Sequence, residues 1–183
     1  MSEAKVRVRV AHNAMHLPVV ALRGLVVFPN NLVHFEVGRE KSIAAVEWAM
    51  ANNSNVFLVA QKAMETSDPT QADLFSYGVV AEVKQVLRVS GDLVKVLVEG
   101  KYRAKLSALD ASGDFLLSEV RPAPVRPGKP EEAVETEALL RALKAGFDEY
   151  LGMNPRLGKD VVFAIVSSDD PAFLSEYMPA NLL

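Results

Sequence analysis

The chain has 183 residues; half of them are hydrophobic, 23% are charged, and the formal net charge is −3. This composition excludes a collagen-like, coiled-coil or extensively disordered chain, and the length is sufficient to bury a sizeable core. Cysteine is absent, which excludes disulfides, thiol catalysis and cysteine-bound metal. The negative net charge argues against nucleic acid binding by the chain as a whole.

Residues 1–16 are predicted to form an N-terminal arm. Lys5, Arg7 and Arg9 interrupt the apolar core that a signal peptide would need. No stretch of the sequence approaches the 18 apolar residues of a membrane span, so no membrane partner is expected. We therefore expect a cytoplasmic protein.

Residues 17–121 are predicted to form a β-rich, barrel-like subdomain, because apolar residues there mostly recur with a period of two. The pattern predicts strands over residues 32–37 and 56–60 and one amphipathic helix over 39–52. A polar loop over 65–73 and a hairpin turn at 90–92 separate further strands. One face of the long strand after residue 77 is expected to carry Val79, Ala81, Val83, Leu87 and Val89.

Four prolines between Pro122 and Pro130 predict an extended connector, since proline suits neither helix interiors nor central strands. From residue 131 to 183 the apolar period is helical, which predicts a C-terminal helical bundle. Its helices are expected near residues 131–153, 159–166 and from Asp170-Pro171 onward. The chain stops at Leu183 without a helix stop signal, as a segment of a longer protein would.

Catalytic and cofactor motifs are not found in this sequence. His12 and His16 have helical spacing but lack the glutamate of a zinc-protease motif, so no metal site is expected. The three Gly-Lys pairs lack the upstream glycine of a phosphate-binding loop. Gly-x-Ser-x-Gly is also absent. The residues therefore predict no catalytic, cofactor-binding or metal-binding site in this chain.

Two surface features could support binding. Lys101, Arg103 and Lys105 share one strand face, as a phosphate-binding strand would, although a solvated face explains the pattern as well. Apolar residues in loop-like places could instead contact unfolded chains or a partner subunit. The alternative for each of these apolar residues is that it closes the end of the barrel. The candidates for substrate contact are Phe28, Pro29, Leu74, Phe75 and Leu87.

Several segments resemble, in the same order, the N-terminal domain of bacterial Lon, an ATP-dependent protease. The segment from Leu17 to Phe28-Pro29 resembles the opening strand motif of that family. Val37-Gly-Arg-Glu-Lys-Ser42 resembles the start of the family's first helix, and residues 77–87 with 96–103 resemble its central hairpin. The resemblance implies an α+β fold: a mostly antiparallel, PUA-like β subdomain with one helix, followed by helices.

The resemblance also implies a role in recognising unfolded, damaged or degron-bearing proteins and in assembling the parent hexamer with other Lon subunits. ATP, Mg²⁺ and the Ser–Lys protease dyad are implied only for parent domains outside these residues. Three alternatives stay open: a stand-alone Lon-domain adaptor, a PUA-like RNA-binding module and an enzyme. The adaptor would be excluded by a gene that continues past Leu183 into a Gly-x-x-x-x-Gly-Lys motif.

Overall fold

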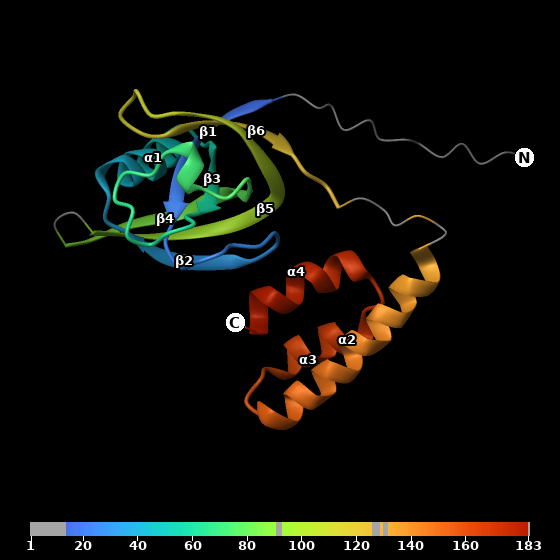
Figure 1. Cartoon of the computed structure of the whole chain (residues 1–183). Helices are drawn as coiled ribbons and strands as arrows, with labels where there is room; N and C mark the ends of the chain where they lie inside the picture. Colours follow the sequence, from blue (N-terminus) through green and yellow to red (C-terminus); the bar gives the residue numbers. More distant parts are fainter. Residues whose placement is uncertain (1–13, 91–92, 126–128, 130–131, 183) are drawn as a thin grey trace, which may run out of the picture. The chain divides into compact units, whose positions relative to one another are not determined.

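The computed structural model describes residues 14–90, 93–125, 129 and 132–182, and these form two compact units divided between Ala123 and Pro124 (Figure 1). Within the described residues the chain is mixed α+β, with six strands in one sheet and four α-helices. The predicted turn at residues 91–92, His12 with the rest of the arm before residue 14, and most of the 122–130 connector lie outside the described residues.

The six strands are assigned to the first unit. In chain order they are β1 (Met15–Leu22), β2 (Leu32–Val37), β3 (Asn55–Ala60), β4 (Tyr77–Ser90), β5 (Leu93–Asp110) and β6 (Leu117–Pro122). Helix α1 (Glu40–Ala51) lies between β2 and β3, and a 3-10 turn, η1 (Gln71–Asp73), precedes β4. The predicted helix over 39–52 and the predicted strands over 32–37 and 56–60 are thereby confirmed.

The strand pairings close a ring. The order in the sheet is β2-β5-β4-β3-β1-β6, and an additional pairing joins β5 to β6. Strand β5 closes the ring because it pairs with strands at both ends of the order. Its first half pairs with β2 and β4, and its second half, from Ala104 to Asp110, pairs with β6. All pairings are antiparallel except that of β1 with β3. The predicted barrel-like arrangement therefore has five strands in the ring and β2 as an added edge.

Strands β1 and β3 are buried on both faces, which explains why their sequences are continuous apolar runs rather than alternating ones. One face of each strand contributes to a core that includes Ala45, Val46 and Ala49 of α1. The other face contributes to a second core with residues of β4, β5 and β6. The two cores hold the ring and α1 together.

The second unit contains α2 (Ala133–Met153), α3 (Lys159–Ser167) and α4 (Pro171–Leu182). The three predicted helices are present, but the predicted helical bundle is not completed by this chain. Phe147, Ile165, Leu174 and Met178 are the buried hydrophobic residues of this unit among those described, while Leu139 remains mostly exposed on α2. A closed bundle would bury that residue. No helix in the described part of the chain has the length and apolarity to cross a membrane.

The side-chain alternation of β4 differs from the prediction after Val83. The register with β5 shifts between Val83 and Gln85, so one extra residue is inserted in β4. Such a bulge moves every later side chain to the opposite face. Val86 consequently packs against the core, whereas Leu87 and Val89 are exposed. The predicted common face of Val79, Ala81, Val83, Leu87 and Val89 was therefore wrong for its last two members.

Candidate functional site

An apolar hollow of about 470 Å³ lies where β4 begins. Three of its lining residues are large and exposed: Val26 (57%), Phe75 (51%) and Tyr77 (58%). Leu58 and Ala60 of β3 also line it, together with Leu22, Val27, Ser76 and Gly78. Exposed apolar residues that gather around a hollow are typical of surfaces that bind a partner or a ligand.

Backbone contacts fix the two sides of this hollow. The Phe75 N–H donates to the carbonyl of Ala60 over 3.1 Å, and the Leu106 N–H donates to the carbonyl of Ser76 over 2.9 Å. Leu74, one residue earlier, is 2% exposed and packs in the second core. The chain is therefore anchored on both sides of Phe75, and the Phe75 side chain remains outside the core.

Gly78 permits the close approach of β4 to β3 beneath the hollow. A Cβ atom at this position would lie 2.3 Å from the Leu58 carbonyl oxygen and 2.7 Å from the Phe57 ring. Any larger side chain would therefore push the start of β4 away from β3. The width of the hollow depends on this glycine.

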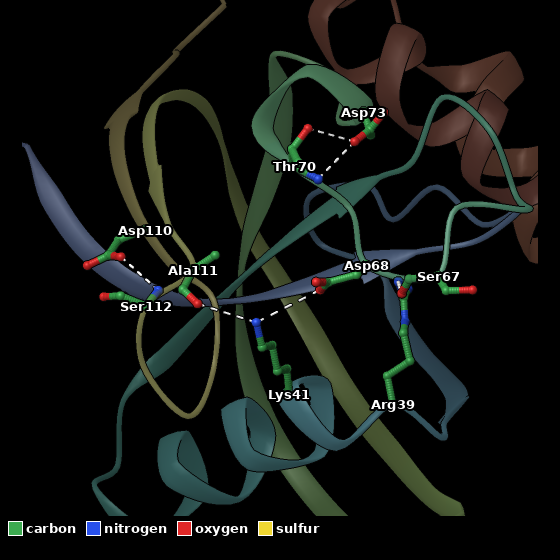
Figure 2. Close-up of polar contacts among 9 residues, drawn as sticks. All are labelled: Arg39, Lys41, Ser67, Asp68, Thr70, Asp73, Asp110, Ala111 and Ser112. Carbon is green, nitrogen blue, oxygen red and sulfur yellow. Dashed lines mark hydrogen bonds and ion pairs between the residues drawn. The ribbon is translucent and has the colours of Figure 1, made fainter.

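Charged and polar contacts hold the loop that leads into Phe75, and Figure 2 shows several of them. Nη1 of Arg39 donates to the Ser67 carbonyl over 3.3 Å. Lys41 lies between the Asp68 carboxylate, at 3.9 Å, and the Ala111 carbonyl, at 3.3 Å. Further along the loop, Thr70 donates through both its hydroxyl and its N–H to Asp73, and these bonds lower the pKa of the Asp73 carboxyl. The loop is thus tied to the start of α1.

One cation borders the hollow. Nζ of Lys105 lies 5.9 Å from the centre of the Tyr77 ring, a cation–π distance. Lys105 is exposed, so this contact adds about 0.5–1 kcal/mol at most. The arrangement offers apolar surface with one neighbouring positive charge and no nucleophile or acid–base pair.

The five residues predicted for substrate contact occupy different environments. Phe75 and Leu87 are exposed, Phe28 is half-buried, and Pro29 and Leu74 are buried. Leu74 is therefore not available to a partner in this fold, because it fills the barrel core. The structure brings Phe75 together with Val26 and Val27, next to Phe28 in sequence, but Phe28 itself does not line the hollow.

Leu87 belongs to a second, smaller hollow of about 250 Å³, which His34 and Lys95 also line. Ten residues of β4 separate Tyr77 from Leu87, which corresponds to roughly 30 Å along a strand. Phe75 and Leu87 therefore belong to two separate surfaces. This makes Leu87 a useful comparison for experiments on Phe75.

Sequence reasoning missed Val26 and Tyr77. Val26 belongs to the apolar run that ends at Phe28, and the run itself did not reveal which members are buried. Tyr77 opens a strand, where an aromatic residue is equally typical of a core position. A usable signal was the nearness of both residues to glycines: Val26 lies two residues after Gly24, where the chain turns, and Tyr77 precedes Gly78, where β4 approaches β3 closely.

Lys101, the first cation of the predicted basic face, is engaged in ion pairs. Nζ of Lys101 lies 2.7 Å from Glu82 and 2.8 Å from Glu99, and Lys84 lies 2.8 Å from each of the same carboxylates. Hydrogen bonds from Lys101 and then Lys84 lower the pKa of Glu99 to about 2. A lysine committed to two carboxylates is poorly placed to bind phosphates. The RNA-binding alternative is therefore not favoured.

Metal ligands do not gather in the described part of the chain, where no group of three or more His, Asp or Glu residues could hold an ion. The hollow at Phe75 carries no charged residue among those that line it. What the geometry offers is reversible contact with apolar groups.

Comparison with known proteins relates the whole described chain to one family. Residues 16–183 match the family model of the ATP-dependent protease La (LON) substrate-binding domain. Lon protease of Desulforamulus reducens is 37% identical over 166 residues, which cover 91% of this chain and 20% of that protein. Lon protease of Escherichia coli K12 is 36% identical over 168 residues, covering 92% of this chain and 21% of that protein. The chain thus spans about a fifth of the length of these relatives.

A solved structure has the same fold. The N-terminal domain of Mycobacterium avium complex Lon protease aligns with a TM-score of 0.70 and 21% sequence identity. The alignment covers 90% of this chain and 81% of that domain.

Proposed function

Since the chain belongs to the family of ATP-dependent protease La (LON) substrate-binding domains, we propose that it selects proteins for degradation by binding their exposed apolar segments. The contact surface is the hollow lined by Val26, Phe75 and Tyr77, which we call the Phe75 surface. The observation that supports it is the clustering of these three exposed apolar side chains around one hollow.

The physical basis is that unfolded and damaged proteins expose apolar side chains that native proteins bury. A hollow of about 470 Å³ can admit one or two such side chains. Binding there needs no defined polar pattern, so many sequences are accepted with modest affinity. Several weak contacts along one unfolded chain, or on several copies of the domain, raise the effective affinity.

The wider role rests on the relatives. We infer that this domain acts within a longer, ATP-dependent serine endopeptidase whose subunits assemble as a hexamer in the cytoplasm. ATP, Mg²⁺ and the catalytic dyad belong to segments of that parent, because the chain corresponds to about a fifth of its relatives. The role of the domain is to hold the substrate, and hydrolysis takes place elsewhere in the parent.

The test is a binding isotherm with a permanently unfolded protein, fluorescein-labelled reduced carboxymethylated α-lactalbumin, followed by fluorescence anisotropy. Phe75→Ser is expected to weaken binding about fivefold, since burial of a half-exposed phenylalanine contributes on the order of 1 kcal/mol. Leu87→Ser is the matched control, equally exposed on the second hollow. Loss of affinity in Leu87→Ser, with wild-type affinity in Phe75→Ser, would reject the Phe75 surface.

A further inference from the structure

A second pocket, of about 400 Å³, lies between the end of β1 and the start of α1. Leu22, Leu25 and Phe35 are among its apolar lining residues, and its polar ones are Arg23, Glu36, Arg39 and Ser42. The opening strand motif and the Val37–Ser42 motif, which are separate in sequence, meet here. The Phe75 surface does not account for this pocket.

The start of α1 borders the pocket through Arg39 and Ser42. The N–H groups of Ser42 and Ile43 both donate to the Arg39 carbonyl at 2.9 Å. Arg39 occupies the N-cap position without giving a side-chain cap. Among the described residues, the N–H groups of Glu40 and Lys41 have no acceptor. A helix start of this kind favours a negatively charged group.

Ser42 provides an independent sign of a ligand. Its side chain is only 5% exposed, it lines the pocket, and its hydroxyl has no hydrogen-bond partner in residues 14–90, 93–125, 129 and 132–182. In this part of the chain, every side-chain polar atom that is sealed from solvent has a hydrogen-bond partner. Because the Ser42 hydroxyl has none, it borders open space. The hydroxyl is therefore available to hydrogen-bond water or a ligand in the pocket.

Arg39 supplies the charge. Its guanidinium is partly buried and donates to neutral oxygens: Nη2 to the Ala21 carbonyl at 2.5 Å and to Gln61 Oε1 at 2.6 Å, and Nη1 to the Ser67 carbonyl. These bonds use three of its five N–H groups. Within the described chain no carboxylate lies within ion-pair distance of Arg39. Burial, and then the neighbouring Arg23, lower the pKa of Arg39, and the more distant Asp68 carboxylate only partly offsets them.

The charges around the pocket limit the ligand. Arg23 and Glu36 line the pocket with exposed side chains, Glu40 follows Arg39, and Asp68 lies 3.9 Å from Lys41. These carboxylates oppose a dianion such as a phosphate ester more strongly than a single negative charge. The apolar half of the lining further favours a ligand that joins a carboxylate to an apolar group.

We propose that this pocket, which we call the carboxylate pocket, binds a carboxylate of a substrate polypeptide together with an adjacent apolar side chain. Ser42 and the free N–H groups of Arg39 hold the carboxylate, and Leu22, Leu25 and Phe35 contact the side chain. The carboxylate is either a C-terminus or an Asp or Glu side chain. The proposal extends the proposed function, because it names a second substrate contact, but it does not depend on Phe75.

The experiment is an NMR titration of the ¹⁵N-labelled full chain with N-acetyl-leucine and, separately, with N-acetyl-leucine amide. N-acetyl-leucine is expected to shift the amides of Gly38, Glu40, Lys41 and Ser42 saturably. The amide, which lacks the charge, is expected to bind at least about tenfold more weakly. Ser42→Ala is expected to reduce the affinity about fivefold without changing the unfolding midpoint. Equal shifts with both compounds, no shifts with either, or wild-type affinity in Ser42→Ala would overturn the proposal.

Two apolar peptides then identify the source of the carboxylate. One has a free C-terminal leucine, and the other is amidated and carries an internal glutamate beside leucine. Binding of the first alone assigns the C-terminus, and binding of the second assigns the side chain; binding of neither rejects a polypeptide ligand. Phe75→Ser should leave all these affinities unchanged, so failure here is distinguishable from failure of the Phe75 surface.

Discussion

Nη2 of Arg39 lies 2.6 Å from Oε1 of Gln61, and this hydrogen bond joins the start of α1 to the end of β3. The buried Gln61 amide also donates to the carbonyls of Ala63, at 3.2 Å, and Thr66, at 3.0 Å. One side chain therefore fixes both the guanidinium of the carboxylate pocket and the loop that leads to the Phe75 surface.

Gln61→Leu removes the acceptor for Arg39 and the donor for two loop carbonyls. We expect the free energy of unfolding to fall by about 1–3 kcal/mol, because buried polar groups lose their partners. Urea unfolding followed by the fluorescence of Trp48, the single tryptophan, measures it in the first unit. Gln71→Leu is the control, since Gln71 is exposed and its change should stay within about 0.5 kcal/mol. An equal effect of both substitutions would contradict the role given to Gln61.

Leu74 and Phe75 are adjacent, but their replacement by alanine should destabilise the first unit to very different extents. Leu74→Ala leaves a cavity in the second core and is expected to destabilise the first unit by about 2–5 kcal/mol. Phe75→Ala should cost less than about 1 kcal/mol, because half of that side chain is already in solvent. The same urea titration compares them. A larger loss of stability for Phe75→Ala would show that Phe75 serves the core.

Gly78 and Gly146 should also respond oppositely to alanine. Gly78→Ala places a Cβ 2.3 Å from the Leu58 carbonyl oxygen and should destabilise the first unit by about 1–3 kcal/mol. Gly146→Ala, within α2, meets nothing within 4 Å and should stabilise that helix by about 0.5–1 kcal/mol. Thermal unfolding followed by circular dichroism at 222 nm measures the effect of Gly146→Ala on helix α2. Thermal unfolding followed by Trp48 fluorescence measures the effect of Gly78→Ala on the first unit. Equal effects of the two substitutions would contradict the close approach at Gly78.

Glu99 should make the free energy of unfolding depend on pH under acidic conditions. Its pKa is lowered to about 2 from the ordinary value of 4.5 by hydrogen bonds from Lys101 and Lys84. A carboxyl with a lowered folded-state pKa contributes stability that is complete above pH 4.5 and is lost as the pH falls toward about 2. Glu99→Gln should flatten the fall in unfolding free energy between these values, measured by urea titrations at each pH. An unchanged slope in Glu99→Gln would exclude this contribution.

Periodicity was sufficient to predict α1, the central strands and the three C-terminal helices, because each is specified by local spacing. The β4 bulge near Lys84 could not be predicted from spacing, since it depends on how β4 pairs with β5. For that reason the face of Leu87 was predicted incorrectly.

The candidate site was predicted only in part for a similar reason. Leu74 follows a polar loop and therefore resembled an exposed residue. Its burial depends on a bridge to Gln61, thirteen residues earlier, which no local pattern reveals. Phe75 has the same sequence context but the opposite environment. The carboxylate pocket joins residues from two distant motifs, so sequence reasoning did not find it.

The most direct test of the central claim is an NMR titration of the ¹⁵N-labelled chain with reduced carboxymethylated α-lactalbumin. We predict chemical-shift changes at Val26, Phe75, Ser76 and Tyr77 that need about fivefold more ligand in Phe75→Ser, while Leu87→Ser retains the wild-type response. Shift changes that spare these residues, or that persist unchanged in Phe75→Ser, would contradict the claim that this surface recognises unfolded proteins.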